Sequence, residues 1–102
     1  MKVVSQNKMY EVKKCDSFLD KLIGFMFTKK KKEYGLCFDN CSIHTFFCLQ
    51  PLDIILLDED YNVLFIYPHV KCNKIILKKK NIKYILEFSS GILDLKSINI
   101  LK

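Results

Sequence analysis

The chain has 102 residues, of which 50% are hydrophobic and 27% charged, and its formal net charge is +6. This length suits one domain with one core, and the apolar fraction argues against an intrinsically disordered chain. No apolar run approaches the roughly 20 residues that cross a bilayer, and residues 1–8 contain no apolar segment typical of a signal peptide. We therefore expect a soluble, cytoplasmic protein with a single domain over residues 1–102.

The cysteines and the basic residues narrow the function classes. The five cysteines are unevenly spaced, unlike a secreted disulfide framework, so we expect reduced and mostly buried thiols. Every basic residue is lysine. A chain without arginine lacks the planar guanidinium that binds phosphate or guanine through paired hydrogen bonds.

The first third of the chain predicts one strand and one helix. Residues 9–13 alternate apolar and polar side chains, which indicates a strand with one face inward. Asp16 or Ser17 can cap a short helix whose apolar residues recur at helical spacing over 18–23. Gly24 then ends that helix.

The stretch 41–58 holds the longest apolar runs and is the expected centre of the fold. A strand over 35–38 precedes it, and residues 43–49 predict one continuous strand. Pro51 interrupts the run and predicts a bend or bulge. Residues 52–57 are apolar on both faces apart from Asp53, a pattern that fits a central strand covered on both sides.

The rest of the chain adds strands separated by turns. The sequence predicts a hairpin turn at 58–62, a partner strand over 63–67 ended by Pro68, an edge strand at 75–77, a strand over 84–88, a short helix over 92–95 capped by Ser89 or Ser90, and a last strand near 98–101. The expected fold class is mainly β (α+β): a single compact antiparallel β-sheet or barrel-like domain with one or two short helices. The expected core is Phe18, Leu22, Phe25, Phe27, Phe38, Phe46, Phe47, Ile54, Leu56, Val63, Phe65, Leu86 and Phe88.

Short motifs along the chain carry a family resemblance. They are Gly24-Phe25-Met26-Phe27, Cys41-Ser42-Ile43-His44-Thr45-Phe46-Phe47, Pro51-Leu52-Asp53-Ile54, Leu57-Asp58, and Leu86-Glu87-Phe88 with Gly91. In these motifs and their order the chain resembles the small prokaryotic family known as domain of unknown function 192. The resemblance implies a compact, mainly antiparallel β fold with one or two short helices. It implies no established activity, so no catalytic residue follows from it.

The chain departs from this family at three places. Cys48 stands where the family usually has methionine, and Cys72 stands where proline is common. A Gly-Asp pair near the end of the family's sequences is replaced here by residues 97–100. This last departure affects the expected last turn and not the core.

His44 and Asp53 are the first candidates for a ligand site, with Thr45 and Cys41 in the same stretch. A histidine and a carboxylate lining a pocket where strands meet could serve as base or ligand near neutral pH. The structural alternative, which we favour, is that Asp53 accepts backbone N–H bonds left open by the bend, while His44 holds a loop carbonyl.

Metal binding and cysteine chemistry are weaker alternatives. Two residues separate Cys41 from His44 and His69 from Cys72, and four such ligands would suit tetrahedral zinc. Because these residues lie on apolar strands rather than glycine-rich turns, we expect no metal and no other cofactor. A nucleophile at Cys41 or Cys48 activated by His44 is disfavoured further, since nothing indicates an oxyanion hole.

The lysine runs at 29–32 and 78–80 lie near Tyr34 and Tyr84. Lysines could neutralise phosphates and tyrosines could stack on bases, but solvated loops explain the runs better. Three functions therefore stay open. We favour a non-enzymatic binding or interaction module with any ligand near the histidine–aspartate pair. The others are a metal-dependent or hydrolytic enzyme using that pair and the cysteines, and a weak nucleic-acid binder.

Overall fold

The computed structural model describes the chain except for residues 16–29, 40–42, 46–47, 78 and 102, and at residues 43 and 44 it describes the backbone alone. The described residues form β-strands and no helix. The strands are β1 (Lys2–Ser5), β2 (Lys8–Lys14), β3 (Gly35–Asp39), β4 (Ile43–His44), β5 (Leu52–Leu57), β6 (Val63–Val70), β7 (Ile75–Ile76), β8 (Tyr84–Ser89) and β9 (Ile98–Leu101).

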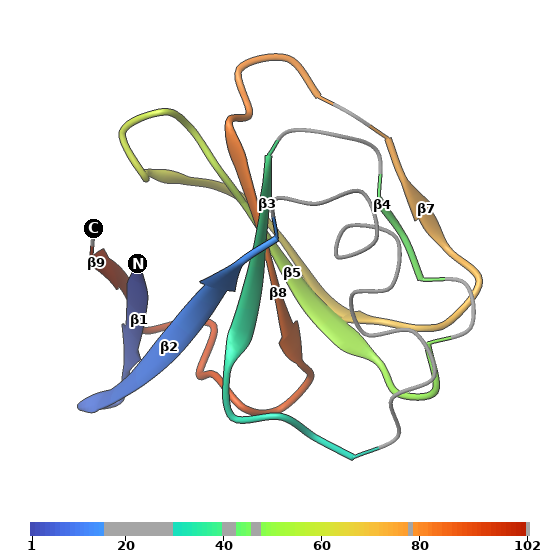
Figure 1. The fold of residues 1–102 in the computed structure, drawn as a ribbon, viewed down its shortest axis with the longest axis horizontal. Coiled ribbons are helices and arrows are strands. Elements are labelled where there is room, and N and C mark those ends of the chain that lie inside the picture. Colours follow the sequence, from blue (N-terminus) through green and yellow to red (C-terminus); the bar gives the residue numbers. More distant parts are fainter. Residues whose placement is uncertain (16–29, 40–42, 46–47, 78, 102) are drawn as a thin grey trace.

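Seven strands form one curled sheet in the order β6-β5-β8-β3-β2-β1-β9, and β4 and β7 form a separate two-stranded sheet (Figure 1). Neighbouring strands run antiparallel, except for β2 and β3, which are parallel. The prediction of a mainly β, mainly antiparallel fold is confirmed. Within the described residues no helix is long and apolar enough to cross a membrane.

The central strand β5 is buried along its whole length, as its two-sided apolar pattern predicts. Leu52, Ile54 and Leu56 pack into a core on one face of the sheet. Ile55 and Leu57 pack into a second core on the other face. Full burial of each such side chain contributes about 1.5–3 kcal/mol, so this strand is a major source of stability.

Strand β1 was not predicted, although its Val3 is completely buried. Val3 pairs with Tyr10 across a hairpin whose two loop residues, Gln6 and Asn7, have φ angles of 48° and 63°. Such left-handed loop residues match the twist of a two-residue hairpin, and asparagine adopts them readily. Asn7 was therefore the available signal for a hairpin turn, but a strand of four residues is too short to show an alternation of apolar and polar side chains.

Two predicted strand boundaries are wrong. Of the strand expected over residues 43–49, the described residues keep only β4, and Thr45 and Leu49 lie in no strand. Thr45 instead bonds through its hydroxyl to the Lys71 carbonyl and through its carbonyl to the Asn73 N–H. Pro68 does not end β6, which continues to Val70. A proline is tolerated there because β6 is an edge strand, where one side needs no ladder partner.

The helix predicted over 92–95 is also wrong, since those residues form turns. Gly91 has a φ of 90°, and the Asp94 backbone N–H donates to Ser5 Oγ at 2.8 Å. These features hold the segment against β1 as a series of turns. The helix predicted over 18–23 lies outside the described residues.

The predicted core is correct on the central strands and wrong on β6. Phe38, Ile54, Leu56, Leu86 and Phe88 are buried as expected. Val63 and Phe65 are exposed, because β6 is the edge of the sheet and none of the described strands covers its outer side. The other predicted core residues lie outside the described part of the chain: Phe18, Leu22, Phe25, Phe27, Phe46 and Phe47.

Candidate functional site

A groove of about 440 Å³ opens where β5 begins and β6 ends. Its described lining comes from two segments, 48–51 and 69–72, and consists of Cys48, Leu49, Gln50, Pro51, His69, Lys71 and Cys72. Leu49 and Pro51 make one wall mainly apolar, while His69 and Lys71 bring basic groups to the other. A groove of this size accommodates a small molecule.

Asp53 fixes the position of His69 in this groove. The Asp53 side chain is only 2% exposed, and its Oδ1 accepts the backbone N–H of His69 at 2.9 Å. His69 has a φ of 50° and lies where the β5–β6 register shifts, so its N–H belongs to a bulge. Asp53 Oδ2 accepts a longer bond, 3.4 Å, from Gly91. Asp53 thus accepts backbone N–H bonds, as the structural alternative anticipated, but from the β6 bulge.

Thr45 fixes the other end of the same wall. Its buried hydroxyl donates to the Lys71 carbonyl at 2.7 Å and accepts the Lys74 N–H at 2.9 Å. Its backbone N–H donates to the Lys74 carbonyl at 2.9 Å, and its carbonyl accepts from Asn73 at 3.2 Å. Hydrogen bonds from both the side chain and the backbone of one residue therefore set the course of the segment 71–74.

His69 and Ser90 lie as a hydrogen-bonded pair beside the groove, with His69 Nδ1 3.1 Å from Ser90 Oγ. This distance suits a base and its nucleophile. The Asp53 carboxylate, however, binds the His69 backbone, and the Gly91 N–H is directed to Asp53. Within the described residues, neither a carboxylate oriented on the imidazole nor an oxyanion-binding N–H is in place.

The two groove cysteines differ in burial and in chemistry. Cys48 is buried, and that burial, followed by the negative charge of Glu87, raises its thiol pKa to about 11. Cys72 is exposed. A thiol with so high a pKa stays protonated at neutral pH, so Cys48 is not an activated nucleophile.

Glu87 is the residue that sequence reasoning missed. It lies on β8 between Leu36 and Ile54, its side chain is 4% exposed, and burial raises its pKa to about 8. Such a carboxyl is mostly protonated at neutral pH, although it influences the neighbouring Cys48 when charged. The available signal was a single glutamate in an apolar strand, within the Leu86-Glu87-Phe88 motif.

The structure brings together only part of the predicted site. His69 and Cys72 line one groove, whereas Cys41 and the side chain of His44 lie outside the described residues. The His44 backbone pairs with Ile75 in the small sheet. Within the part of the chain that the structure describes, no three His, Cys, Asp or Glu side chains are grouped to hold a metal.

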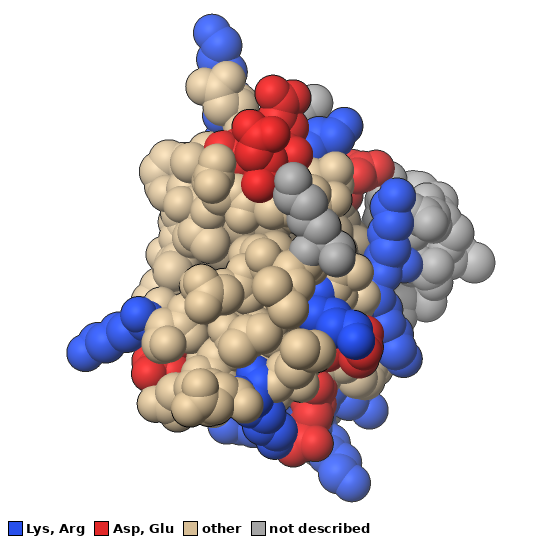
Figure 2. Space-filling model, turned by 90° about the vertical axis from the view of Figure 1, so that its left-hand side faces the viewer, with Lys and Arg blue, Asp and Glu red and all other residues tan. Residues whose placement is uncertain are grey.

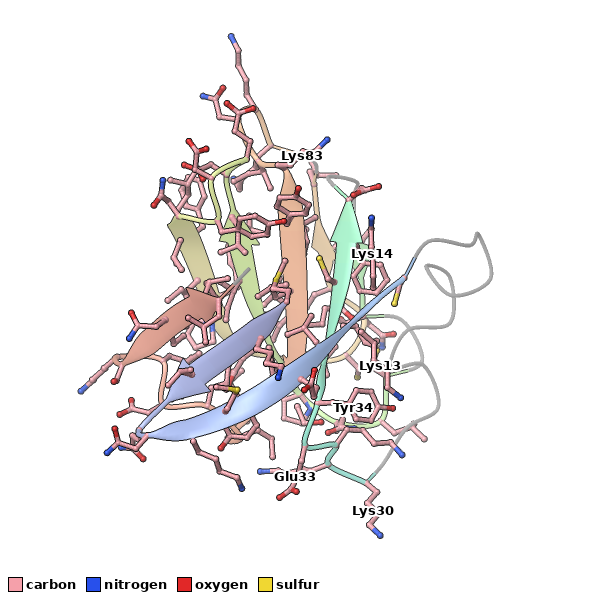
Figure 3. The ribbon with its side chains drawn as sticks, turned by 60° about the vertical axis from the view of Figure 1, so that its left-hand side comes forward. Lys13, Lys14, Lys30, Glu33, Tyr34 and Lys83 are labelled. Carbon is pink, nitrogen blue, oxygen red and sulfur yellow. The ribbon has the colours of Figure 1, made fainter. Side chains whose placement is uncertain are left out.

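The described lysines of the two runs, at 30–32 and 79–80, lie at opposite ends of the sheet. One run precedes β3 and the other precedes β8, and these strands are antiparallel. Figure 3 accordingly shows Lys30 and Lys83 at opposite ends of β3. Near the first run, Lys13 Nζ lies 4.1 Å from the centre of the Tyr34 ring, so this tyrosine face already has a cation. The runs therefore do not form one continuous basic surface.

The chain has recognisable relatives among known proteins. Residues 1–100 match the DUF192 family, described as Uncharacterized ACR, COG1430, and the chain belongs to that family. It is 36% identical over 89 residues to a UPF0127 protein of Pyrococcus horikoshii, covering 80% of this chain and 75% of that one. It is 29% identical over 97 residues to a UPF0127 protein of Pyrococcus furiosus, covering 88% and 81% of the two chains.

Two solved structures share the fold at low sequence identity. A protein of unknown function from Novosphingobium aromaticivorans superposes with a TM-score of 0.77 at 17% identity, covering 97% of this chain and 82% of that one. A putative transcription regulator from Sinorhizobium meliloti gives a TM-score of 0.75 at 15% identity, covering 96% and 89%. The family description and the first of these structures name no activity, so they assign none to this chain.

Proposed function

We propose that this protein is a non-enzymatic binding module whose ligand lies in the groove between segments 48–51 and 69–72. One observation carries the proposal: Asp53 and Thr45, two buried polar side chains, direct their hydrogen bonds to the backbone of the groove wall. Buried polar groups are costly unless paired, and here their pairing holds a concave surface in shape.

The chemistry of the wall supports a small anionic ligand with an apolar part. Lys71 supplies an ammonium group and His69 an imidazole, and the described lining contains no carboxylate. Leu49 and Pro51 supply apolar contact opposite them. A ligand of this class would pair its anionic group with Lys71 and bury its apolar part against the 48–51 wall.

Anilinonaphthalene sulfonate, an apolar ring system bearing one anionic group, is a direct probe of this groove. We expect saturable binding to the wild type, about tenfold weaker binding to Lys71→Gln through loss of one charge-assisted bond, and little change in Lys96→Gln. Lys96 is a suitable control because it is also exposed and lies outside the groove lining. Equal weakening in both variants, measured by fluorescence titration, would show only general charge attraction and defeat the proposal.

Hydrolysis is a second candidate, favoured by the 3.1 Å between His69 Nδ1 and Ser90 Oγ. Slow turnover of an activated ester that disappears in Ser90→Ala would support it. We expect Ser90→Ala instead to leave probe binding intact and to remove no turnover, because the described geometry lacks an oriented carboxylate. The test is a side-by-side ester assay and titration of both proteins.

Likeness in fold to the Sinorhizobium meliloti protein, described as a putative transcription regulator, makes nucleic-acid binding a third candidate. Its support in this chain is the net charge of +6. Separation of the lysine runs argues for weak binding only, lost as salt approaches physiological strength. Tight binding of duplex DNA that persists at that salt, in an anisotropy titration, would favour this candidate instead.

We also infer that the chain acts as one domain in the cytoplasm. Its core clusters draw on strands from both halves of the sequence, which supports a single folding unit. Cys37, Cys48 and Cys72 have free thiols, which supports a reducing compartment. Of the two short helices expected from the sequence, only the one over residues 18–23 stays part of this proposal.

A further inference from the structure

Two cysteines line the groove, one on each of its two segments. Cys48 belongs to the segment 48–51 and Cys72 to the segment 69–72, and both have free thiols. Cys48 is buried and Cys72 is exposed, so Cys72 is the thiol that a reagent in solvent meets first. The proposed ligand-binding function uses neither thiol.

Hydrogen bonds to one carbonyl hold the backbones of these two cysteines close together. The Thr45 carbonyl oxygen accepts the Cys48 N–H and the Asn73 N–H, each at 3.2 Å. The two nitrogen atoms are therefore at most twice that distance apart, and the Cys72 Cα is only two covalent bonds from the Asn73 nitrogen. Disulfides join cysteines whose Cα atoms are about 4.4–6.8 Å apart. The shared acceptor thus brings Cys72 within reach of Cys48 after a small shift of the chain.

The segment that carries Cys72 can make this shift at low cost. Residues 71–74 are exposed, lie in no strand and belong to neither apolar core. Segments with so few buried apolar contacts open locally without unfolding the rest of the protein. The negative charge of Cys72 is also among the causes, after burial and the charge of Glu87, that raise the pKa of the Cys48 thiol to about 11, which fits two neighbouring sulfur atoms.

The charges at the groove favour an anionic reagent. Lys71 and His69 lie in the lining, and the described lining contains no carboxylate. The acidic turn at 58–60 follows β5 at the end of that strand away from the groove. Figure 2 shows acidic side chains gathered at the top of the side that it displays, above a broad uncharged surface. An anionic reagent is therefore attracted toward Cys72 by the adjacent Lys71.

We propose that Cys48 and Cys72 form a reversible disulfide, made by exchange with a small anionic disulfide, that closes the groove. In the first step the Cys72 thiolate attacks one sulfur of the small disulfide, which breaks the S–S bond and releases one small thiol carrying the proton that Cys72 lost. In the second step Cys48 gives up its proton and attacks the Cys72 sulfur, which releases the second small thiol. Two protein thiols are oxidised and one small disulfide is reduced to two thiols. Formation of the bridge is independent of the proposed function, whereas its effect on ligand binding rests on that function.

Mass spectrometry of the full chain, incubated with glutathione disulfide and quenched with acid, tests the bridge. We expect a mixed disulfide on Cys72 first, because the raised pKa of the Cys48 thiol slows the second step, and then a protein lighter than the reduced one by two hydrogen atoms. In Cys48→Ala the mixed disulfide on Cys72 should persist, and in Cys72→Ser the Cys48 thiol should stay unmodified. Absence of the bridge in the wild type, or a bridge to another cysteine, would overturn the proposal.

The matched control is Cys37→Ala. Cys37 is also buried and free, but it packs in the core on the other face of the sheet from Cys48. Its removal should leave the rate and the position of bridging unchanged. A bridge that disappeared in this variant would contradict the assigned pair.

Cystamine, a small cationic disulfide, tests the charge of the reagent. The ratio of the rate with glutathione disulfide to the rate with cystamine should fall at least about threefold in Lys71→Gln and stay unchanged in Lys96→Gln. Equal ratios in the two variants would overturn the preference for an anionic reagent.

Closure of the groove is measured on the purified bridged protein. Anilinonaphthalene sulfonate should bind it at least about tenfold more weakly than the reduced protein, and dithiothreitol should restore binding. Hydrogen exchange over 71–74 should also slow on bridging. Unchanged exchange would overturn closure, and equal probe binding by both forms would overturn the effect on the ligand. If the reduced protein bound no probe, the proposed function would fail, while mass and hydrogen exchange would still decide the bridge and the closure.

Discussion

The centre of the sheet and the rim of the groove are held by different forces. Strands β5, β8 and β3 are buried between two apolar cores. The rim at 69–74 is largely exposed and is held by hydrogen bonds from Asp53 and Thr45. Substitutions at the centre should therefore act on global stability, and substitutions at the rim should act on local shape.

The largest expected change in the free energy of unfolding is at the centre of the sheet. Leu86 is 0% exposed and belongs to the second core. Leu86→Ala should lower the free energy of unfolding by about 3 kcal/mol, through lost apolar burial and the cavity left behind. Urea denaturation followed by circular dichroism measures this change.

The matched control for that change is Leu77→Ala, since Leu77 is 70% exposed. We expect this substitution to change the free energy of unfolding by less than about 0.5 kcal/mol. Similar losses in both variants would mean that the burial difference between centre and surface does not control stability.

The pH dependence of stability isolates one polar group at the centre. Glu87 has a pKa of about 8 in the folded protein against an ordinary value of 4.5, so between these values the folded chain retains a proton that the unfolded chain has lost. The free energy of unfolding should therefore fall as pH rises from about 5 to 8, by on the order of 3 kcal/mol, and level off above.

Glu87→Gln removes this titration while keeping the shape of the side chain. The variant should lose most of the decline with pH and should be more stable than the wild type at about pH 8. Thermal melts over this pH range provide the measurement. An unchanged slope in Glu87→Gln would assign the decline to another group.

A smaller and local effect is expected at the rim. Thr45→Val removes the hydroxyl that bonds to the Lys71 carbonyl and the Lys74 N–H, which should cost about 1–2 kcal/mol. Hydrogen exchange should show this as faster exchange across 71–74, with amides of β5 almost unchanged. Thr45→Ser, which keeps the hydroxyl, is the control and should exchange as the wild type does.

The difference between the apolar centre of the sheet and the hydrogen-bonded rim of the groove also explains which elements the sequence predicts. The apolar run over 52–57 predicted β5, because a strand that is buried on both faces needs apolar residues at nearly every position. The alternation over 84–88 specified β8 in the same way, and its one glutamate was the visible exception. Where stability comes from apolar burial, hydrophobic periodicity is sufficient to locate the element.

No comparable sequence pattern predicts the groove. Its shape depends on Asp53 reaching His69, 16 positions later, and on Thr45 reaching Lys74, 29 positions later. Spacing in the sequence does not encode such long-range bonds between side chain and backbone. Asp53 was therefore recognised as a buried acceptor without its partner, and His69 was considered only as a metal ligand and not as part of a groove with Lys71.

The smallest effect on stability is expected at the groove thiols, where the two cysteines should instead differ in their rate of chemical modification. Cys72 is exposed, whereas the Cys48 pKa is raised to about 11, so at neutral pH a maleimide should modify Cys72 at least about tenfold faster. Peptide mass spectrometry after timed labelling resolves the two sites. Cys72→Ser should remove the fast reaction without altering the melting temperature. If Cys48 reacted as quickly as Cys72, the segment around Cys48 would have to open readily to solvent, and the contrast between the buried Cys48 and the exposed rim would fail.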